Sequence, residues 1–133
     1  GKWETGERQV LDHFPDQVTI RTMGEGITWD TQDKARDIAA AEAAWEVSKE
    51  MIDDPSYDLV ILDELNIVLR YDYLDLEAVL DTFRKKRGML HIVVTGRNAK
   101  PELIDAADLV TEMTQIKHPF RDQNVRAQKG IEF

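Results

Sequence analysis

Four consecutive aliphatic residues in the middle of the chain, Leu59 to Leu62, place the strongest constraint on its fold. A strand with one face on solvent alternates apolar and polar residues, whereas an unbroken aliphatic run predicts burial on both faces, as in the middle of a parallel sheet. Residues 89–97 contain a second aliphatic run and predict a second buried strand. Because parallel strands need a long crossover connection, usually a helix, the chain is expected to place helices between its strands.

The segments around these two runs alternate between strand-like and helix-like patterns. Apolar residues recur at helical spacing in residues 74–87, and Gly88 then predicts the end of that helix. Residues 1–16 are irregular and residues 117–133 show no period. This order predicts an α/β fold, with a mainly parallel sheet and helices on both faces. We expect strands over 17–23, 57–64, 89–97 and 108–116, and helices over 31–52, 74–87 and 101–107.

The composition, 42% hydrophobic and 32% charged, is that of one globular domain, which we expect over residues 1–133. The net charge of −9 argues against a nucleic-acid binder or a protein of anionic membranes, because both need a basic face. The absence of cysteine excludes disulfides and a cysteine nucleophile. The chain opens at Gly1 without an initiator methionine or a signal-like segment, so we expect a cytoplasmic protein, given as a fragment or a processed product.

Three segments that follow expected strands contain residues suited to ligand binding: residues 24–29, Asp63 with Glu64, and residues 95–97. Ligands bind at the carboxyl ends of strands in open α/β sheets, so we expect all three segments at one edge. Two carboxylates after a buried strand are costly unless a cation joins them, and Mg²⁺ binds one or two carboxylates together with phosphate oxygens. Aliphatic residues followed by Asp-Glu form the Walker B pattern, although two solvated acids at a strand end explain it equally well.

The other two segments also have two interpretations each. Gly24–Asp30 is either a loop that closes on a flat apolar ligand or a turn that places Ile27 and Trp29 in the core; Gly-x-Gly by itself favours the turn. Arg97 either binds phosphate through its planar guanidinium or forms a surface ion pair. The basic residues 84–87 are explained by the dipole of the expected helix. The three histidines are far apart and have no metal-ligand spacing.

Taken together, these segments resemble the P-loop branch of the ATP:corrinoid adenosyltransferase family. Gly26–Gln32 is similar to the Gly-Phe-Thr-Trp-Glu-Thr-Gln loop of that family, and Asp58–Asn66 is similar to its Walker B strand. Further segments that resemble the family are residues 3–7, 71–74, 94–97, 116–120 and 128–133. The resemblance extends over essentially the whole chain and implies a RecA-like P-loop nucleotide-binding fold.

The resemblance also implies an activity. The family transfers the 5′-deoxyadenosyl group of ATP to the cobalt of a reduced Co(I) corrinoid and releases triphosphate, in adenosylcobalamin biosynthesis or salvage. By this resemblance, Asp63 and Glu64 are the catalytic residues and hold Mg²⁺. An electron-donating reductant protein and a homodimer are the implied protein partners. The residues implied in binding ATP or the corrinoid are Ile27, Thr28, Trp29, Asn66 and Arg97.

Two features depart from the family pattern. Ile27 stands where the family has phenylalanine, so it covers less of a corrin plane than an aromatic ring. No Gly-x-x-x-x-Gly-Lys-[Ser/Thr] motif is present, and the family places its P-loop unit ahead of the residue that matches Gly1. We therefore expect an amino-terminally truncated domain. The alternatives are a non-catalytic module that binds a corrinoid or a partner, and a Walker B protein of another function.

Overall fold

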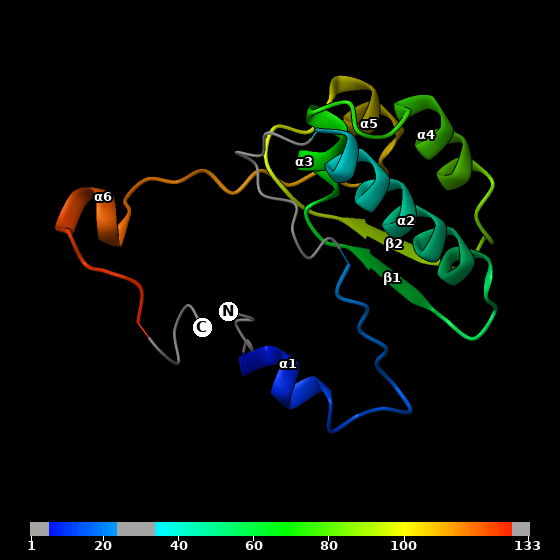
Figure 1. The fold of residues 1–133 in the computed structure, drawn as a ribbon, viewed down its shortest axis with the longest axis horizontal. Coiled ribbons are helices and arrows are strands. Elements are labelled where there is room, and N and C mark those ends of the chain that lie inside the picture. The colour runs from blue at the N-terminus through cyan, green and yellow to red at the C-terminus, as the bar shows by residue number, and fades with distance from the viewer. Residues whose placement is uncertain (1–5, 24–33, 129–133) are drawn as a thin grey trace. The chain divides into compact units, whose positions relative to one another are not determined.

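The computed structural model describes residues 6–23 and 34–128 (Figure 1). The chain divides into two compact units, residues 1–22 with 111–133, and residues 23–110, while a single domain over the whole chain stays a prediction. None of the described helices is both long enough and apolar enough to cross a membrane. The elements are α1 (Gly6–Leu11), α2 (Lys34–Asp53), β1 (Leu59–Leu62), α3 (Leu65–Arg70), α4 (Leu76–Arg84), β2 (His91–Val94), α5 (Pro101–Ala106) and α6 (Pro119–Gln123).

The unit of residues 23–110 contains a parallel sheet formed by β1 and β2. Leu59 pairs with His91 at one end of the two strands, and Leu62 pairs with Val94 at the other. Helices α3 and α4 form the connection between the strands. The α/β class and the parallel pairing are therefore confirmed, with both strands shorter than the sequence pattern predicts.

The core lies on one face of this sheet. Val60 and Leu62 are 4% and 8% exposed, whereas Leu59 and Ile61, which point to the other face, are 49% and 58% exposed. The predictions of a strand buried on both faces and of helices on both faces are thus wrong for the described residues. An aliphatic run shows that both faces of a strand could be buried. Successive side chains point to opposite faces, however, and each face is buried only if another element packs against it. The buried core residues are Trp45, Ile52, Val60, Leu62, Leu65, Leu69, Val79, Leu80, Leu90 and Leu103.

Helix α2 covers the buried face with an apolar stripe. Ala41, Trp45 and Ile52 recur at helical spacing and are all buried. The Trp45 ring meets the Phe83 ring of α4 edge to face, with 6.0 Å between centroids. In Figure 1, α2 runs antiparallel to the two strands, so it begins at the end of the sheet where both arrows point. The expected helix over 31–52 is confirmed from Lys34 onward, since residues 31–33 lie outside the described residues.

The two later helices follow the sequence signals at their starts. The Asp75 side chain caps α4 by accepting a hydrogen bond from the Glu77 N–H at 3.1 Å. Pro101 begins α5, as proline at a first helical position predicts. The predicted end of α4 is wrong, because the helix ends at Arg84, four residues before Gly88.

Arg87 therefore lies outside α4, and the helix dipole does not explain it. Its Nη2 donates to the carbonyl oxygens of Asp54, at 2.9 Å, and Tyr57, at 2.7 Å. These carbonyls belong to the connection between α2 and β1. The guanidinium thus joins two connections that are about thirty residues apart, which corrects the interpretation of this basic run.

Three short helices have no sequence prediction. Helix α3 starts directly after β1 and buries Leu65 and Leu69, a span too short to establish a period. Helices α1 and α6 have six and five residues and no buried side chain. Such helices depend on their end contacts: the His118 side chain caps α6 by accepting from the N–H groups of Phe120 and Arg121.

The strands predicted over 17–23 and 108–116 are absent from the described sheet. Residues 17–21 keep the predicted alternation, since Val18 and Ile20 are half-buried and Thr19 is exposed, but the alternation ends there because residues 21–23 are all exposed. Leu109 and Met113 are 84% and 94% exposed. Alternation and hydrophobicity make a segment suitable for a strand, but a strand forms only beside a partner that pairs with its backbone.

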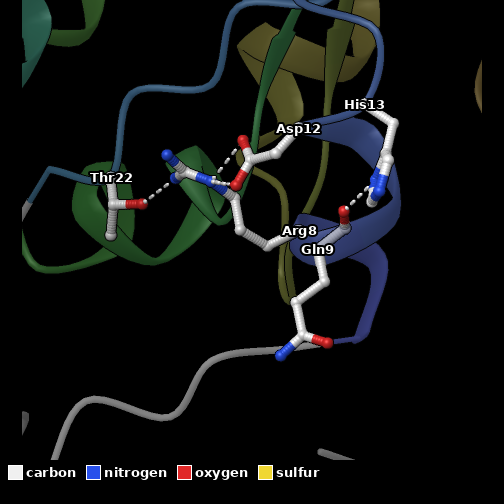
Figure 2. Close-up of polar contacts among 5 residues, drawn as sticks. All are labelled: Arg8, Gln9, Asp12, His13 and Thr22. Carbon is white, nitrogen blue, oxygen red and sulfur yellow. Dashed lines mark hydrogen bonds and ion pairs between the residues drawn. The ribbon is translucent and has the colours of Figure 1, made fainter.

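In the unit of residues 1–22 with 111–133, Arg8 and Gln9 of α1 form hydrogen bonds with the segment that follows the helix (Figure 2). Arg8 Nε donates to Asp12 Oδ1 at 3.1 Å, and Arg8 Nη1 donates to Thr22 Oγ1 at 3.0 Å. His13 Nδ1 donates to the Gln9 carbonyl oxygen at 2.8 Å, one turn back. These contacts are mostly exposed, so their role here is to hold local structure.

Candidate functional site

The two predicted acids lie where β1 leaves the sheet. Asp63 follows the last residue of β1, and Glu64 precedes α3 with a left-handed backbone, φ 62°. Both residues are exposed. The sharp turn at Glu64 allows the chain to pass at once from strand to helix, so both carboxyl groups stay at the carboxyl edge of the sheet.

Thr95, the residue after β2, lies beside these acids. Its Oγ1 donates a hydrogen bond to Asp63 Oδ1 at 2.6 Å and accepts one from the Glu64 N–H at 3.0 Å. Its N–H donates to the Leu62 carbonyl oxygen at 3.2 Å, which extends the strand ladder by one residue. The prediction that Asp63-Glu64 and residues 95–97 share one edge is therefore confirmed.

Gly96 allows the two strand ends to approach closely. Its φ is +125°, a conformation that residues with a Cβ rarely adopt. A Cβ on Gly96 would lie 2.8 Å from the Asn66 Cβ and 3.4 Å from Glu64 Oε2. The Glu64 carboxylate and the Asn66 side chain thus lie against the Gly96 backbone, and these three residues belong to one cluster with Asp63 and Thr95.

Asn66 is a predicted binding residue that the structure places inside this cluster. It is 7% exposed, and its N–H donates to the Thr95 carbonyl oxygen at 3.3 Å. Its Oδ1 is buried without a hydrogen-bond partner among the described residues. A buried amide oxygen is costly to leave unpaired, by about 1–3 kcal/mol, so this atom is suited to accept a ligand donor or to bind a cation.

Arg97 is also at the carboxyl edge, and it is exposed. Among the described residues, the ion pairs do not include Arg97, so the alternative of a surface ion pair is not seen there. Its guanidinium is available to an anion at this edge. The predicted binding residues Ile27, Thr28 and Trp29 lie outside the described residues, and their place relative to the acids stays a prediction.

A second polar contact ties the loop after β2 to the loop after α3. Lys100 Nζ donates to Asp72 Oδ1. This hydrogen bond, and next the positive charge of Lys100, hold the pKa of the Asp72 carboxyl below its usual value of 3.8, with a further contribution from Lys34. Lys34 is the first residue of α2, so the start of α2 contributes positive charge near this loop.

The donor set fits Mg²⁺. Asp63 Oδ2 and the Glu64 carboxylate accept no hydrogen bond from the described residues, and together with Asn66 Oδ1 they offer only hard oxygen donors. Nowhere in residues 6–23 and 34–128 do three or more His, Asp or Glu side chains form a metal-binding group. Mg²⁺ commonly takes one or two carboxylates and completes its shell with phosphate oxygens and water, so a pair of acids suffices.

An open groove of about 550 Å³ lies between α2 and the start of α4. It contains none of the predicted site residues, and its charged side chains are mainly acidic. We therefore place the candidate site by its chemistry, at the carboxyl edge, and not by concavity. The groove residues are Ala39, Glu42, Ala43, Trp45, Glu46, Lys49, Tyr73, Leu74, Asp75 and Ala78.

The sequence pattern left two parts of this site unassigned. The hydroxyl of Thr95 and the close approach at Gly96 have no specific prediction, although both residues are in a predicted segment. The available signal was register: once β1 and β2 are paired from Leu62 to Val94, Asp63 and Thr95 are the next residues on each strand. This signal can be used only once the parallel pairing of β1 with β2 is known.

Comparison with known proteins shows which family this chain is similar to. A family model described as ATP:corrinoid adenosyltransferase BtuR/CobO/CobP matches residues 1–133. A corrinoid adenosyltransferase of a Sinorhizobium species is 53% identical over 135 aligned residues, which cover all of this chain and 63% of that protein. A corrinoid adenosyltransferase of Pseudomonas aeruginosa is 51% identical over 133 residues, which cover all of this chain and 65% of that protein.

More distant relatives extend the same match. The corrinoid adenosyltransferase CobA of Salmonella typhimurium is 41% identical over 133 residues, with all of this chain and 66% of that protein aligned. The chain thus spans about two thirds of the length of these relatives.

Proposed function

Because the chain belongs to the ATP:corrinoid adenosyltransferase family, we propose that it transfers the 5′-deoxyadenosyl group of ATP to the cobalt of a reduced corrinoid. The observation that carries this proposal is the cluster at the carboxyl edge of β1 and β2, where Asp63 and Glu64 meet Thr95 and Gly96. The family match supports the proposed reaction, and the cluster supports the proposed site for a metal-bound triphosphate.

In this reaction the substrate itself provides the nucleophile. The electron pair of Co(I) attacks the ribose C5′, the Co–C bond forms, and the bond between C5′ and the triphosphate oxygen breaks with its electron pair on the triphosphate. Cobalt is thereby oxidised to Co(III). The protein needs no covalent nucleophile, which agrees with a chain that has no cysteine. Its contribution is positioning of the two substrates and stabilisation of the leaving triphosphate.

We assign the triphosphate end to the carboxyl edge. Asp63 and Glu64 would hold Mg²⁺, which neutralises charge on the leaving triphosphate. Arg97, exposed at the same edge, would bind a phosphate oxygen, and Asn66 Oδ1 would accept a hydrogen bond from the nucleotide or contribute to the metal shell. In this proposal the parallel pair of β1 and β2 would be part of a RecA-like sheet.

We assign the corrinoid to the segment of Ile27, Thr28 and Trp29. In this assignment the Trp29 ring packs against the corrin plane, and Ile27 helps to exclude water, which would otherwise compete as a nucleophile. The Co(I) state requires a supply of electrons, so we include a reductant protein as a partner. A homodimer is the assembly that the family likeness supports.

The test is formation of the adenosylated corrinoid. The purified protein is incubated with ATP, Mg²⁺ and chemically reduced corrinoid, and the Co–C product and the released triphosphate are measured together. We expect one triphosphate for each Co–C bond, and at least a tenfold loss of rate in Glu64→Gln. Glu50→Gln is the matched control, because Glu50 is exposed on α2 and away from the carboxyl edge.

Three outcomes would contradict the proposal. Equal rates for Glu64→Gln and the unchanged protein would remove the metal assignment. Corrinoid binding without any Co–C product would favour the alternative of a non-catalytic corrinoid-binding module. A product formed without release of triphosphate would exclude the proposed leaving group.

A further inference from the structure

One side chain, Thr95, connects the ends of the two strands. Its hydroxyl has a single proton, which it donates to Asp63 Oδ1 at 2.6 Å, while its oxygen accepts from the Glu64 N–H at 3.0 Å. Its backbone carbonyl accepts from the Asn66 N–H at 3.3 Å. Thr95 therefore contacts Asp63, Glu64 and Asn66, the three polar residues among the first four after β1.

The two hydroxyl contacts act on different groups. The bond to Asp63 involves one carboxylate oxygen and restricts rotation of the carboxylate, so Oδ2 remains the oxygen that faces no described donor. The hydrogen bond from the Glu64 N–H to Thr95 Oγ1 fixes the backbone of Glu64. This residue has φ 62°, and the chain turns there from β1 into α3. A non-glycine residue adopts this conformation only when its surroundings fix it.

We propose that Thr95 is a positioning residue, which orients the Asp63 carboxylate and fixes the turn at Glu64 so that both acids present oxygens to one divalent cation bound with the triphosphate. This inference depends on the proposed function, because it concerns the same site. In this role Thr95 would act through Asp63 and Glu64 and would not itself bind the metal or the nucleotide. Groups that orient metal ligands in this way commonly change metal affinity by about 10–100-fold when they are removed.

A purely structural role for Thr95 predicts different behaviour. If the hydroxyl only joined the strands, its removal would lower stability and leave metal affinity per folded molecule unchanged. Thr95→Val keeps the shape of the side chain and removes both hydrogen bonds, whereas Thr95→Ser keeps the hydroxyl. Thr82→Val is the matched control, since its hydroxyl donates to the Ala78 carbonyl oxygen within α4, at 3.0 Å.

The first measurement is Mn²⁺ affinity in the presence of ATP, followed by the electron paramagnetic resonance of free Mn²⁺. We expect Thr95→Val to weaken Mn²⁺ binding about 10–100-fold, Thr95→Ser to stay within about threefold, and Thr82→Val to have no effect. If Thr95→Val does not fold, Thr95→Cys takes its place, because a thiol is a weak donor of similar size. Unchanged affinity in the variant that lacks the hydroxyl would overturn the inference, as would an equal loss in Thr95→Ser.

The second measurement needs neither metal nor nucleotide. Amide hydrogen exchange at Glu64 is expected to be at least tenfold faster in Thr95→Val than in the unchanged protein, and near the original rate in Thr95→Ser. Glu64→Gln separates this inference from the proposed function. If Glu64→Gln also leaves Mn²⁺ affinity unchanged, the metal assignment itself is wrong; if Glu64→Gln weakens binding and Thr95→Val does not, only the positioning by Thr95 is wrong.

Discussion

Replacing Gly96 by alanine tests how strongly the close contact between the strand ends constrains the fold. Gly96 has φ +125°, and an added Cβ would lie 2.8 Å from the Asn66 Cβ and 3.4 Å from Glu64 Oε2. The Asn66 Cβ is attached directly to the backbone of α3, so it cannot move aside as the end of a flexible side chain could. Both the backbone and the packing therefore oppose the substitution.

The expected loss has two parts. Holding a residue with a Cβ in a rarely adopted backbone conformation costs about 1–3 kcal/mol. Forcing a methyl group into a packed site costs typically about 1–3 kcal/mol more. The sum, about 2–6 kcal/mol, is a large share of a typical domain's free energy of unfolding, about 5–15 kcal/mol. With a urea slope of about 2 kcal/mol per molar, the unfolding midpoint should fall by about 1–3 M.

The assay is urea unfolding followed by circular dichroism, with Gly88→Ala as the matched control. Gly88 has no heavy atom within 4 Å of an added Cβ and no positive φ. Alanine at that position should be neutral or stabilise by about 0.4–1 kcal/mol. A loss below about 1 kcal/mol in Gly96→Ala, or an equal loss in the control, would refute this account of the strand ends.

Two further substitutions test contacts outside the cluster. Arg87→Ala leaves two backbone carbonyls without their charged donor and should lower the free energy of unfolding by about 1–3 kcal/mol. Arg84→Ala is the control: it loses one long ion pair of an exposed side chain, and its free energy of unfolding should change by no more than about 0.5 kcal/mol. Equal urea midpoints for the two variants would contradict this expectation. Lys100→Met removes the donor that lowers the pKa of Asp72. A carboxyl group with a lowered pKa in the folded protein stabilises the fold at pH values above its unfolded pKa of 3.8. That stabilisation is lost as the pH falls through the lowered pKa. The difference in free energy of unfolding between the unchanged protein and Lys100→Met should therefore become smaller below about pH 4 and also in 1 M salt. A difference that is constant from pH 2 to 7 would contradict this expectation.

The sequence was most informative where one local pattern has one structural meaning. The aliphatic run before Asp63 predicted β1, and the helical spacing of apolar residues in 74–87 predicted α4. The register of a parallel pair then brings Asp63 beside Thr95. These features depend on side-chain periodicity and on the geometry of paired strands, both of which are local or nearly local.

The sequence was least informative where structure depends on a partner segment. Residues 17–23 and 108–116 have the composition of strands but do not pair in the described sheet. Ile61 belongs to an aliphatic run, yet it is 58% exposed because nothing described covers its face. A hydrophobic pattern shows which secondary structure a segment can form, and contacts with other segments determine whether it forms.

By itself, the sequence determined the α/β class, the positions of β1 and β2 along the chain, and the family. The tertiary structure alone decided that the Thr95 hydroxyl would contact both acids and that Gly96 would lie against Asn66 and Glu64. The physical reason is distance along the chain, since residues 63–66 and 95–96 are about thirty positions apart. No local preference fixes contacts of that separation; the parallel pairing of β1 with β2 does.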